Sequence, residues 1–352
     1  MLNIFIIALI SAFAITYFSS HAVIYLVGKY SIFDMPGERK IHTHPVLTLG
    51  GLSFIFTFYI MIIGGLIIYP QFAGQILLHN LTALIVSQIL IVGLGIYDDL
   101  RGLSAGIKFT IQLGASVILI YFLGFSINII TNPFGGEIHL GIFSVPITIL
   151  WLVGITNAIN LLDGLDGLAA GIVLISSLFL SFVSLYLGQN GVALLFIILA
   201  SSLLAFLKFN FYKARIFMGD TGSMFLGFTI AVLSLLISMK TTVSLSLMVP
   251  IISLGIPIMD TSVSFFRRLL KKDNPFRGDK LHIHHILLQS GLSHHHVVIL
   301  VWVITLLFNI IALCFMLIPG RYSLLILLIF ACMVATGIMF LEFIKREKIS
   351  IK

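Results

Sequence analysis

The sequence has few charged residues and almost no cysteine. Asp, Glu, Lys and Arg make up 9% of its 352 residues, while 59% of the residues are hydrophobic. An ordinary soluble domain has about 25% charged residues, so this composition excludes a soluble globule, and it is too apolar for a disordered or collagen-like chain. The two cysteines, Cys314 and Cys332, both lie in apolar stretches. This placement supports neither a disulfide framework nor a cysteine-based metal site.

Long hydrophobic runs are abundant instead, and they recur from end to end. Each run has ~20 residues, enough to cross a hydrocarbon core ~30 Å thick. They predict an all-α polytopic integral membrane protein with about 11 transmembrane helices, forming a single domain over residues 1–352. The predicted spans are 2–27, 48–69, 76–97, 107–124, 142–162, 167–188, 191–208, 222–239, 243–265, 297–318 and 322–344.

The basic residues are distributed unequally between the two sets of connecting loops. If the loops alternate from an outside N-terminus, 18 of the 20 Lys and Arg residues fall inside, and only Lys240 and Arg321 fall outside. Because cytoplasmic loops carry the excess of Lys and Arg, we expect the N-terminus outside and the C-terminus in the cytoplasm. The first cation, Lys29, follows the first hydrophobic segment, whereas a cleavable signal peptide begins with a basic region.

The outside loops are short, apart from a connection that predicts a small external hairpin near 126–141, where Asn132 to Gly136 can form the turn. The net charge of +7 fits a cytoplasmic face against anionic lipid and an anionic substrate, and it requires no nucleic acid. Nearly all acidic residues lie in or beside the cytoplasmic connections. Those connections, where we expect the active site, lie near 28–47, 98–107, 161–168, 208–222 and 266–296.

Two pairs of carboxylates stand out among these acids. Asp98 and Asp99 are adjacent at the end of the third span, where like charges are costly without a cation and where the helix dipole disfavours acids. Asp163 and Asp166 are three residues apart, so they share a face if the turn is helical, and nearby glycines permit close approach of a ligand. We interpret both pairs as functional in preference to their structural alternatives, which are helix termination with pairing to Arg101 or Lys108 for the first pair and a capped turn for the second.

Asp220 opens the eighth span in the segment Phe217 to Ser223, and Asn210 precedes it. Asp220 can be a helix N-cap, or it can bind a phosphate or a phosphate-bound metal at a glycine-rich helix N-terminus. The sequence supports both interpretations equally. Asp260, near the inner end of the ninth span, can likewise pair with Arg267 or Arg268 or contact a substrate.

Two groups of histidines follow in the longest inside loop. His282, His284 and His285 lie among cations, and no Cys or Glu completes a tetrahedral zinc or nickel site, so phosphate contact is favoured. The run His294 to His296 is interpreted as a solvated, interfacial stretch. Hard oxygen ligands favour magnesium, or manganese, over zinc. A magnesium ion held by few carboxylates and by substrate phosphates is the usual arrangement for phosphoryl transfer.

Five motifs, in order over about residues 30–290, resemble those of the polyprenyl-phosphate N-acetylhexosamine-1-phosphate transferases, of the glycosyltransferase family 4 type. They are Arg39-Lys40 with Gly50-Gly51, Asp98-Asp99, Asn157 to Gly167, Phe217 to Ser223, and His282-Ile283-His284-His285. Eleven spans and the His-Ile-His-His form resemble the bacterial UDP-N-acetylglucosamine (UDP-GlcNAc):undecaprenyl-phosphate branch. The muramoyl-pentapeptide branch typically has ten spans and a His-His-His run.

The resemblance implies transfer of GlcNAc-1-phosphate from UDP-GlcNAc to undecaprenyl phosphate, with release of UMP. This reaction would begin a cell-envelope glycan, of the O-antigen, common-antigen or teichoic-acid type, on the cytoplasmic face of a bacterial inner (plasma) membrane. By resemblance, Asp98 or Asp99 deprotonates or orients the lipid phosphate, His282 is catalytic, and Asp220 binds Mg²⁺. The implied substrate-binding residues are Lys40, Asn160, Asp163, Asp166, Asn210, His284 and His285.

The sequence departs from the family at two places. Tyr212-Lys213 replaces prolines found in many members, and Lys280 replaces a usual Arg, whose bidentate phosphate contact a lysine cannot reproduce. Another UDP-N-acetylhexosamine, or a transporter of lipid-linked sugars or metal ions, remains an alternative. A transporter predicts ionisable groups near mid-membrane and inverted repeats, and neither is evident. The sequence leaves open whether the chain forms a homodimer.

Overall fold

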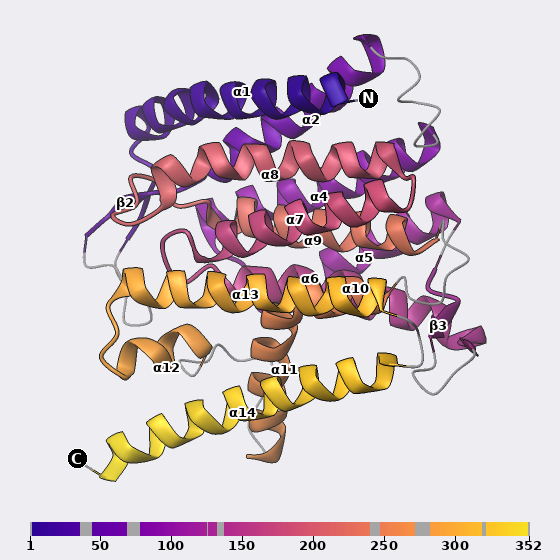
Figure 1. The fold of residues 1–352 in the computed structure, drawn as a ribbon. Coiled ribbons are helices and arrows are strands. Elements are labelled where there is room, and N and C mark those ends of the chain that lie inside the picture. The colour runs from indigo at the N-terminus through magenta and orange to yellow at the C-terminus, as the bar shows by residue number, and fades with distance from the viewer. Residues whose placement is uncertain are drawn as a thin grey trace.

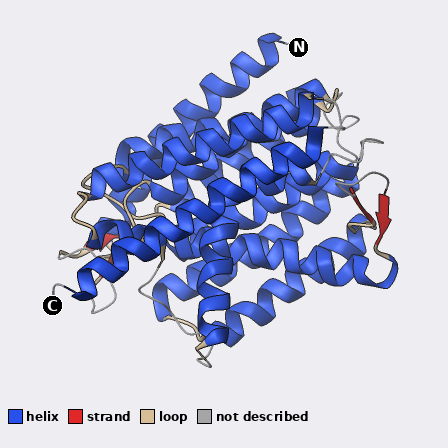
Figure 2. Ribbon diagram, turned by 60° about the horizontal axis from the view of Figure 1, so that its bottom comes forward, coloured by secondary structure: helices blue, strands red, loops and turns tan. Residues whose placement is uncertain are grey.

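The computed structural model describes residues 2–35, 44–68, 78–124, 126–131, 137–239, 247–271, 282–318 and 322–350. Over these residues the chain forms a bundle of helices with two small two-stranded sheets (Figures 1 and 2). In order, the elements are α1 (Leu2–Lys29), β1 (Phe33–Asp34), β2 (Val46–Leu47), α2 (Gly51–Ile68), α4 (Leu78–Arg101), α5 (Ala105–Leu123), β3 (Ile129–Thr131), β4 (Glu137–His139), a 3₁₀ turn (Gly141–Phe143), α6 (Ser144–Leu162), α7 (Leu168–Tyr186), α8 (Asn190–Asn210), α9 (Gly219–Met239), α10 (Met248–Ser253), α11 (Gly255–Leu270), α12 (Ile283–Gln289), α13 (His294–Leu317) and α14 (Ser323–Ser350).

The helices confirm the predicted all-α polytopic membrane protein. Within the described residues, nine helices are long and apolar enough to cross a membrane, and α14 contributes a shorter apolar stretch, Leu324–Gly337. Each of these ten segments falls on one of the predicted spans. Most of these long helices lie side by side with similar axes (Figure 1).

The remaining predicted span, 243–265, is not one continuous helix. Its described part is divided at Leu254 into α10 and α11, and α11 runs across the direction of α13 (Figure 1). Pro257 has no N–H to bond the carbonyl of Ser253, which is the ordinary cause of a break in a helix. The Ser253 carbonyl accepts a hydrogen bond from the Ser176 hydroxyl at 3.3 Å instead. The expectation of one continuous helix at 243–265 was therefore wrong over its described part, 247–265.

The middle of the bundle is α9, which is almost completely buried. Glycines let neighbouring backbones come close to its first turns, as small residues do between membrane helices. A Cβ on Gly95 of α4 would collide with the backbone of Thr221, and a Cβ on Gly51 of α2 would collide with Gly222. The start of α9 is thereby held against the end of α4 and the start of α2.

The two sheets lie at opposite ends of the bundle (Figure 2). In the predicted hairpin, β3 and β4 pair antiparallel, with Ile130 opposite Ile138, which confirms that element. At the other end, β1 pairs antiparallel with β2 and follows α1. The N-terminus lies at the hairpin end and the C-terminus at the β1–β2 end (Figure 1), as an odd number of crossings requires. The assignment of these ends to outside and inside stays a prediction.

Candidate active site

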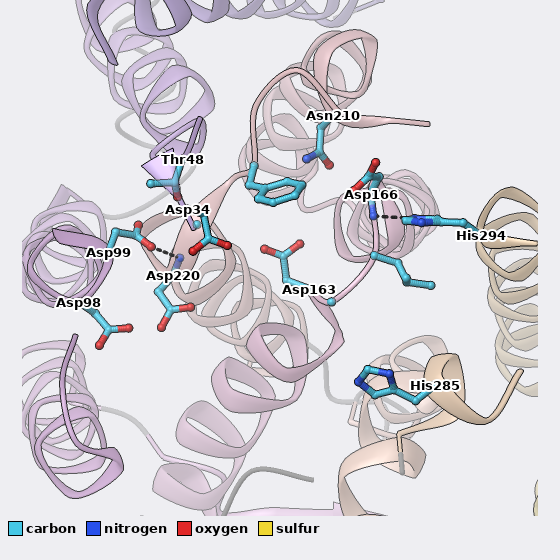
Figure 3. Close-up of a pocket in the computed structure, with 14 residues that line it drawn as sticks. Asp34, Thr48, Asp98, Asp99, Asp163, Asp166, Asn210, Asp220, His285 and His294 are labelled. Atoms are coloured by element: carbon cyan, nitrogen blue, oxygen red, sulfur yellow. Dashed lines mark hydrogen bonds between the residues drawn. The ribbon is translucent and has the colours of Figure 1, made fainter. Parts of the chain in front are cut away.

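A cavity of about 480 Å³ opens at the end of the bundle that carries β1 and β2 (Figure 3). Its walls come from the ends and beginnings of helices that are distant in sequence. The lining residues are Asp34, Thr48, Asp98, Asp99, Asp163, Gly164, Leu165, Asp166, Asn210, Phe217, Gly219, Asp220, His285 and His294. Six of these are aspartates, so the cavity is strongly acidic and favours a cation or a ligand that brings one.

The structure brings most of the predicted site residues to this cavity. Seven of them line it directly, namely Asp98, Asp99, Asp163, Asp166, Asn210, Asp220 and His285. Asn160 contacts Asp220 from behind the wall, while His282 and His284 are buried beside it. Lys40 lies outside the described residues, as does Lys280.

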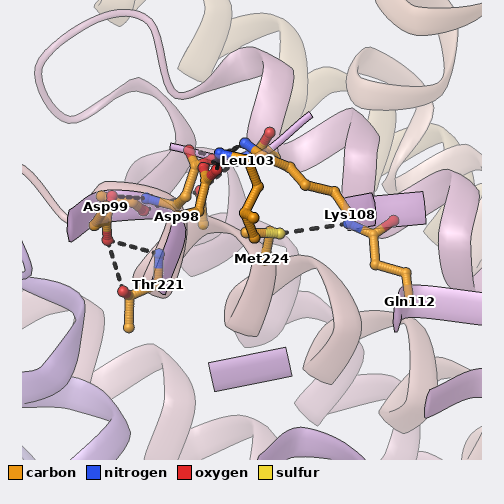
Figure 4. Close-up of polar contacts among 11 residues, drawn as sticks. Asp98, Asp99, Leu103, Lys108, Gln112, Thr221 and Met224 are labelled. Atoms are coloured by element: carbon orange, nitrogen blue, oxygen red, sulfur yellow. Dashed lines mark hydrogen bonds and ion pairs between the residues drawn. The ribbon is translucent and has the colours of Figure 1, made fainter. Parts of the chain in front are cut away.

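Asp99 caps helix α9 from the last turn of α4. Its carboxylate accepts hydrogen bonds from the backbone nitrogen of Asp220 at 2.8 Å and from the backbone nitrogen and hydroxyl of Thr221 at 3.0 and 2.6 Å (Figure 4). A negative charge is unfavourable at the end of α4 and favourable at the start of α9, where N–H groups are unsatisfied. Asp220 is therefore not the N-cap of its own helix, since Asp99 takes that role.

Lys108, near the start of α5, links Asp98 and Asp220. Its ammonium group forms ion pairs with both carboxylates, and a backbone hydrogen bond from Leu103, at 2.7 Å, also holds Asp98 (Figure 4). Asn160 donates to the other oxygen of Asp220 at 3.0 Å and to the Ser223 hydroxyl at 2.9 Å. One cation thus offsets two acids that would otherwise repel one another.

A buried polar layer supports Lys108 and Asn160 one turn deeper in the bundle. Gln112, one turn after Lys108, is 1% exposed and accepts a hydrogen bond from the Asn157 side chain at 2.5 Å. Its amide nitrogen contacts the sulfur of Met224 on α9 at 3.4 Å. Since buried polar groups are costly when unpaired, this layer fixes how α5 and α6 meet α9.

Asp163 points into the cavity from the end of α6 (Figure 3). No hydrogen bond or ion pair to its carboxylate occurs in the described part of the chain. Burial raises the pKa of Asp163 well above its usual value, and the negative charges of Asp220, Asp99 and Asp166 raise it further. Asp163 is therefore the acid of this site that is best placed to receive a proton or to contact a cation.

Asp166 and Asn210 shape the wall of the cavity. The Asp166 carboxylate accepts a hydrogen bond from the backbone nitrogen of Ala214 at 2.9 Å. Asn210 accepts from the backbone nitrogen of Gly167 at 3.1 Å and donates to the carbonyl of Ile216 at 3.0 Å. Both side chains thus tie the α6–α7 turn to the segment that leads from α8 into α9.

The histidine motif packs against the same α6–α7 turn. His284 is 1% exposed, and a Cβ on Gly164 would lie 2.7 Å from its Nε2 atom. Burial, followed by the charge of His285, lowers the pKa of His284 to about 3, so its ring is neutral near pH 7. His285 faces the cavity (Figure 3), which suits the predicted contact with a substrate.

The interpretation of His294 as part of a solvated stretch was wrong. Its Nε2 atom accepts a hydrogen bond from the backbone nitrogen of Asp166 at 2.9 Å, and its ring lines the cavity (Figure 3). The neighbouring His295 packs against Phe211 and Tyr212, with ring centroids 5.4 and 5.2 Å apart. Helix α13 brings these rings to the site. The contact between His294 and Asp166 could not be predicted from the sequence, because the two residues lie far apart along the chain.

Several further site residues were absent from the predicted set, among them Lys108, Asp34, Thr48 and Phe217. The sequence suggested Lys108 as a pairing partner of Asp98 and Asp99, and the structure confirms its ion pair with Asp98. Asp34 lies on β1 inside a loop that was predicted to be part of the site. Phe217 begins one of the five motifs, Phe217 to Ser223, but it was not itself predicted as a site residue.

The donor set suits a hard cation more than a zinc ion. Among the described residues, no group of three or more His, Cys, Asp or Glu side chains could hold a metal ion by itself. Magnesium requires no such group, because it usually binds one or two carboxylates together with water and substrate phosphates. Asp163 and Asp220 are carboxylates of the same cavity, so the residues present fit an ion of that kind.

Comparison with known proteins agrees with this chemistry. The sequence profile of glycosyl transferase family 4 matches residues 81–238. A Bacillus subtilis protein named as a probable undecaprenyl-phosphate N-acetylglucosaminyl 1-phosphate transferase is 39% identical over 313 residues, covering 88% of this chain and 83% of the relative. The decaprenyl-phosphate N-acetylglucosaminephosphotransferase of Mycobacterium leprae is 33% identical over 319 residues, covering 83% of this chain and 79% of the relative.

A more distant branch is similar as well. The phospho-N-acetylmuramoyl-pentapeptide-transferase of Clostridium perfringens is 34% identical over 283 residues, covering 75% of this chain and 81% of the relative. The family that the five motifs predicted is thereby confirmed. The chain belongs to glycosyl transferase family 4, and it is a multi-pass membrane enzyme of the transferase class.

Proposed function

We propose that this protein transfers GlcNAc-1-phosphate from UDP-GlcNAc to undecaprenyl phosphate. The observation that carries the proposal is the cavity at the end of the bundle, where five other aspartates line the same walls as Asp163 and one lysine bridges two of them. The names of the Bacillus subtilis and Mycobacterium leprae relatives support both the polyprenyl phosphate and the GlcNAc group. The product would be undecaprenyl-diphosphate-GlcNAc, the first intermediate of a cell-envelope glycan.

In this reaction, an oxygen of the lipid phosphate attacks the phosphorus atom that carries GlcNAc. A new phosphorus–oxygen bond forms between lipid and sugar phosphate, and the bond to the uridine side of the diphosphate breaks, releasing UMP. Both substrates are anions, so catalysis consists mainly of positioning and charge neutralisation. The site residues supply both functions.

The contacts favour a division of roles among the aspartates. Both oxygens of Asp99 hold the start of α9, and both oxygens of Asp98 are engaged with Leu103 and Lys108, so these two residues orient the site. Asp163, with its unpartnered carboxylate and raised pKa, is the better candidate to accept a proton from the lipid phosphate. His285 would contact the sugar phosphate, with the buried His282 and His284 packed behind the cavity wall, and Lys40 would contribute a further phosphate contact.

Asp220 would hold a magnesium ion. When bound, this ion would offset the charge of the diphosphate and of the departing UMP. Lys108 already holds Asp220 in place, so the carboxylate is oriented before the substrates enter. We place this end of the bundle at the cytoplasmic face of a bacterial plasma membrane, because the basic loops predict that side and UDP-sugars are made in the cytoplasm.

The proposal is tested with purified protein, radiolabelled UDP-GlcNAc, undecaprenyl phosphate and Mg²⁺. We expect a labelled lipid product and stoichiometric UMP, both abolished by EDTA and restored by Mg²⁺. UDP-GalNAc, UDP-glucose and UDP-N-acetylmuramoyl-pentapeptide serve as competing donors. Turnover of another UDP-sugar alone would retain the family and overturn the donor, whereas absence of UMP release with every donor would overturn the reaction.

The alternative of a transporter has less support from the structure. The described acidic side chains of the cavity gather at one end of the bundle, on β1, at the ends of α4 and α6, in the α6–α7 turn and at the start of α9. Alternating access typically uses ionisable groups near mid-membrane. Movement of a lipid-linked sugar across vesicles without UMP release would favour the transporter.

A further inference from the structure

Asp260, on α11, has two hydrogen-bond partners in the histidine motif. One carboxylate oxygen accepts from Nδ1 of His282 at 2.7 Å, and the other accepts from the backbone nitrogen of Ile283 at 2.7 Å. Asp260 is almost fully buried, at 3% exposure. Neither Arg267 nor Arg268 contacts it, although the sequence suggested such a pair; both arginines contact Ser264 instead.

These two bonds connect the interrupted ninth span to the wall of the cavity. The rings of His282 and His284 are stacked, with centroids 6.0 Å apart and an interplanar angle of 5°. His284 in turn packs on Gly164, which follows Asp163 and lines the cavity. A displacement of His282 would therefore move His284 and the turn that presents Asp163.

The hydrogen bond between Asp260 and His282 also determines which ring nitrogen of His282 carries a proton. An ionised carboxylate only accepts hydrogen bonds, so Nδ1 of His282 must be the donor. The Nε2 atom of His282 and the Nδ1 atom of His284 are buried without a hydrogen-bond partner in the described structure. A carboxylate behind a histidine is a recurrent means of fixing the tautomer and orientation of a functional imidazole.

We propose that Asp260 is a positioning residue of the transferase, which holds His282 in the Nδ1–H form and fixes the histidine motif against the Asp163–Gly164 turn. The proposal rests on the proposed function, because the motif acts on the sugar phosphate in that reaction. Asp260 touches no substrate and acts through His282 and the backbone of Ile283. The break between α10 and α11 contributes to this contact, because one continuous helix over both segments would not carry Asp260 across the direction of α13.

The variants Asp260→Asn and Asp260→Ala separate the two contacts. Asparagine keeps an oxygen for the Ile283 nitrogen but turns an amide donor toward His282 Nδ1, which forces the proton to Nε2. Alanine removes both contacts. The matched control is Thr261→Val, which changes the adjacent residue to one of the same shape; the Thr261 hydroxyl is buried without a hydrogen-bond partner in the described structure.

The kinetic experiment measures kcat and the KM of each substrate for these proteins, for His282→Gln and for the double variant Asp260→Asn/His282→Gln. We expect Asp260→Asn to lower kcat by about tenfold to 100-fold, as is typical when the orienting partner of a functional histidine is lost. The KM of undecaprenyl phosphate should stay unchanged, and the double variant should be no slower than His282→Gln. Thr261→Val should match the wild-type protein.

A second measurement does not depend on activity. Hydrogen exchange of the peptide that contains Ile283 should become faster in Asp260→Ala and stay protected in Asp260→Asn and Thr261→Val. Equal exchange in all four proteins would overturn the contact. Wild-type kcat in Asp260→Asn, or losses that multiply in the double variant, would overturn the positioning role. A wild-type protein that made no lipid product would overturn the proposed function and the role within it, while the exchange data would still decide the contact.

Discussion

Asp99 accepts hydrogen bonds from both the backbone nitrogen and the hydroxyl group of Thr221, although 122 positions separate them in the sequence. The acid that ends α4 therefore serves as the cap of α9. This relationship explains why a carboxylate is tolerated at the end of a helix, where its own dipole opposes it. It also places Asp220 in the cavity, because Asp99 holds the backbone nitrogen of Asp220 as well.

We expect Asp99→Ala to destabilise the protein as well as to inactivate it. The substitution removes three hydrogen bonds to a charged acceptor at the start of a buried helix, which should cost about 2 kcal/mol. Thermal unfolding in detergent, followed by intrinsic fluorescence, measures the effect. The control is Asp34→Ala, which removes another acid of the cavity but not the hydrogen bonds between Asp99 and the start of α9. An equal loss of stability in both variants would contradict the capping role of Asp99.

Lys108→Met should abolish most of the activity, because Asp98 and Asp220 would lose the cation that they share. Loss of one preorganised charge contact at a phosphoryl-transfer site should lower kcat roughly 100-fold. The comparison is Lys208→Met, which removes an exposed cation at the end of α8, outside the cavity. Turnover of Lys108→Met close to that of Lys208→Met would show that the bridge has no catalytic importance.

Asp163→Asn should be inactive and yet more stable than the wild-type protein at neutral pH. The raised pKa of Asp163 means that the folded state binds its proton more tightly than the unfolded state does. Its ionised form therefore destabilises the fold increasingly as the pH rises from the unfolded pKa through the folded one, and asparagine removes this penalty. Melting temperatures at several pH values should show a gap at pH 7 that closes under acidic conditions, where Asp163 is protonated. A gap independent of pH would contradict the assignment.

Gly164→Ala should displace the histidine motif, since the added Cβ would lie 2.7 Å from Nε2 of His284. We expect kcat to fall while the melting temperature of the substrate-free protein changes little, because α12 is short and lies at the edge of the bundle. Gly154→Ala on α6 is the matched control, as nothing lies within 4 Å of its added Cβ, and alanine there should stabilise the helix by about 0.5–1 kcal/mol. Steady-state kinetics of both variants measures the effect. Equal kcat in Gly164→Ala and Gly154→Ala would exclude close packing of His284 on the turn that contains Gly164.

The sequence by itself determined the class of the protein and most of its site. Hydrophobic runs of membrane length predicted ten of the segments that the structure shows as apolar helices, because length and apolarity are local properties of the chain. Sparse acids beside those runs predicted the cavity residues Asp98, Asp99, Asp163, Asp166 and Asp220, since a charge at a membrane boundary requires a reason.

Only the tertiary structure decided how these acids divide their roles. Asp99 and Asp220 look alike in sequence, yet one caps a helix and the other faces Lys108 and Asn160. Asp260 looked like a partner for nearby arginines, and its partner is His282, 22 positions later in the histidine motif. His294 was placed in solvent and lies in the cavity. Hydropathy and residue spacing describe each segment by itself. The hydrogen-bond partners of these carboxylates lie in other segments, so they are fixed only when the helices pack together.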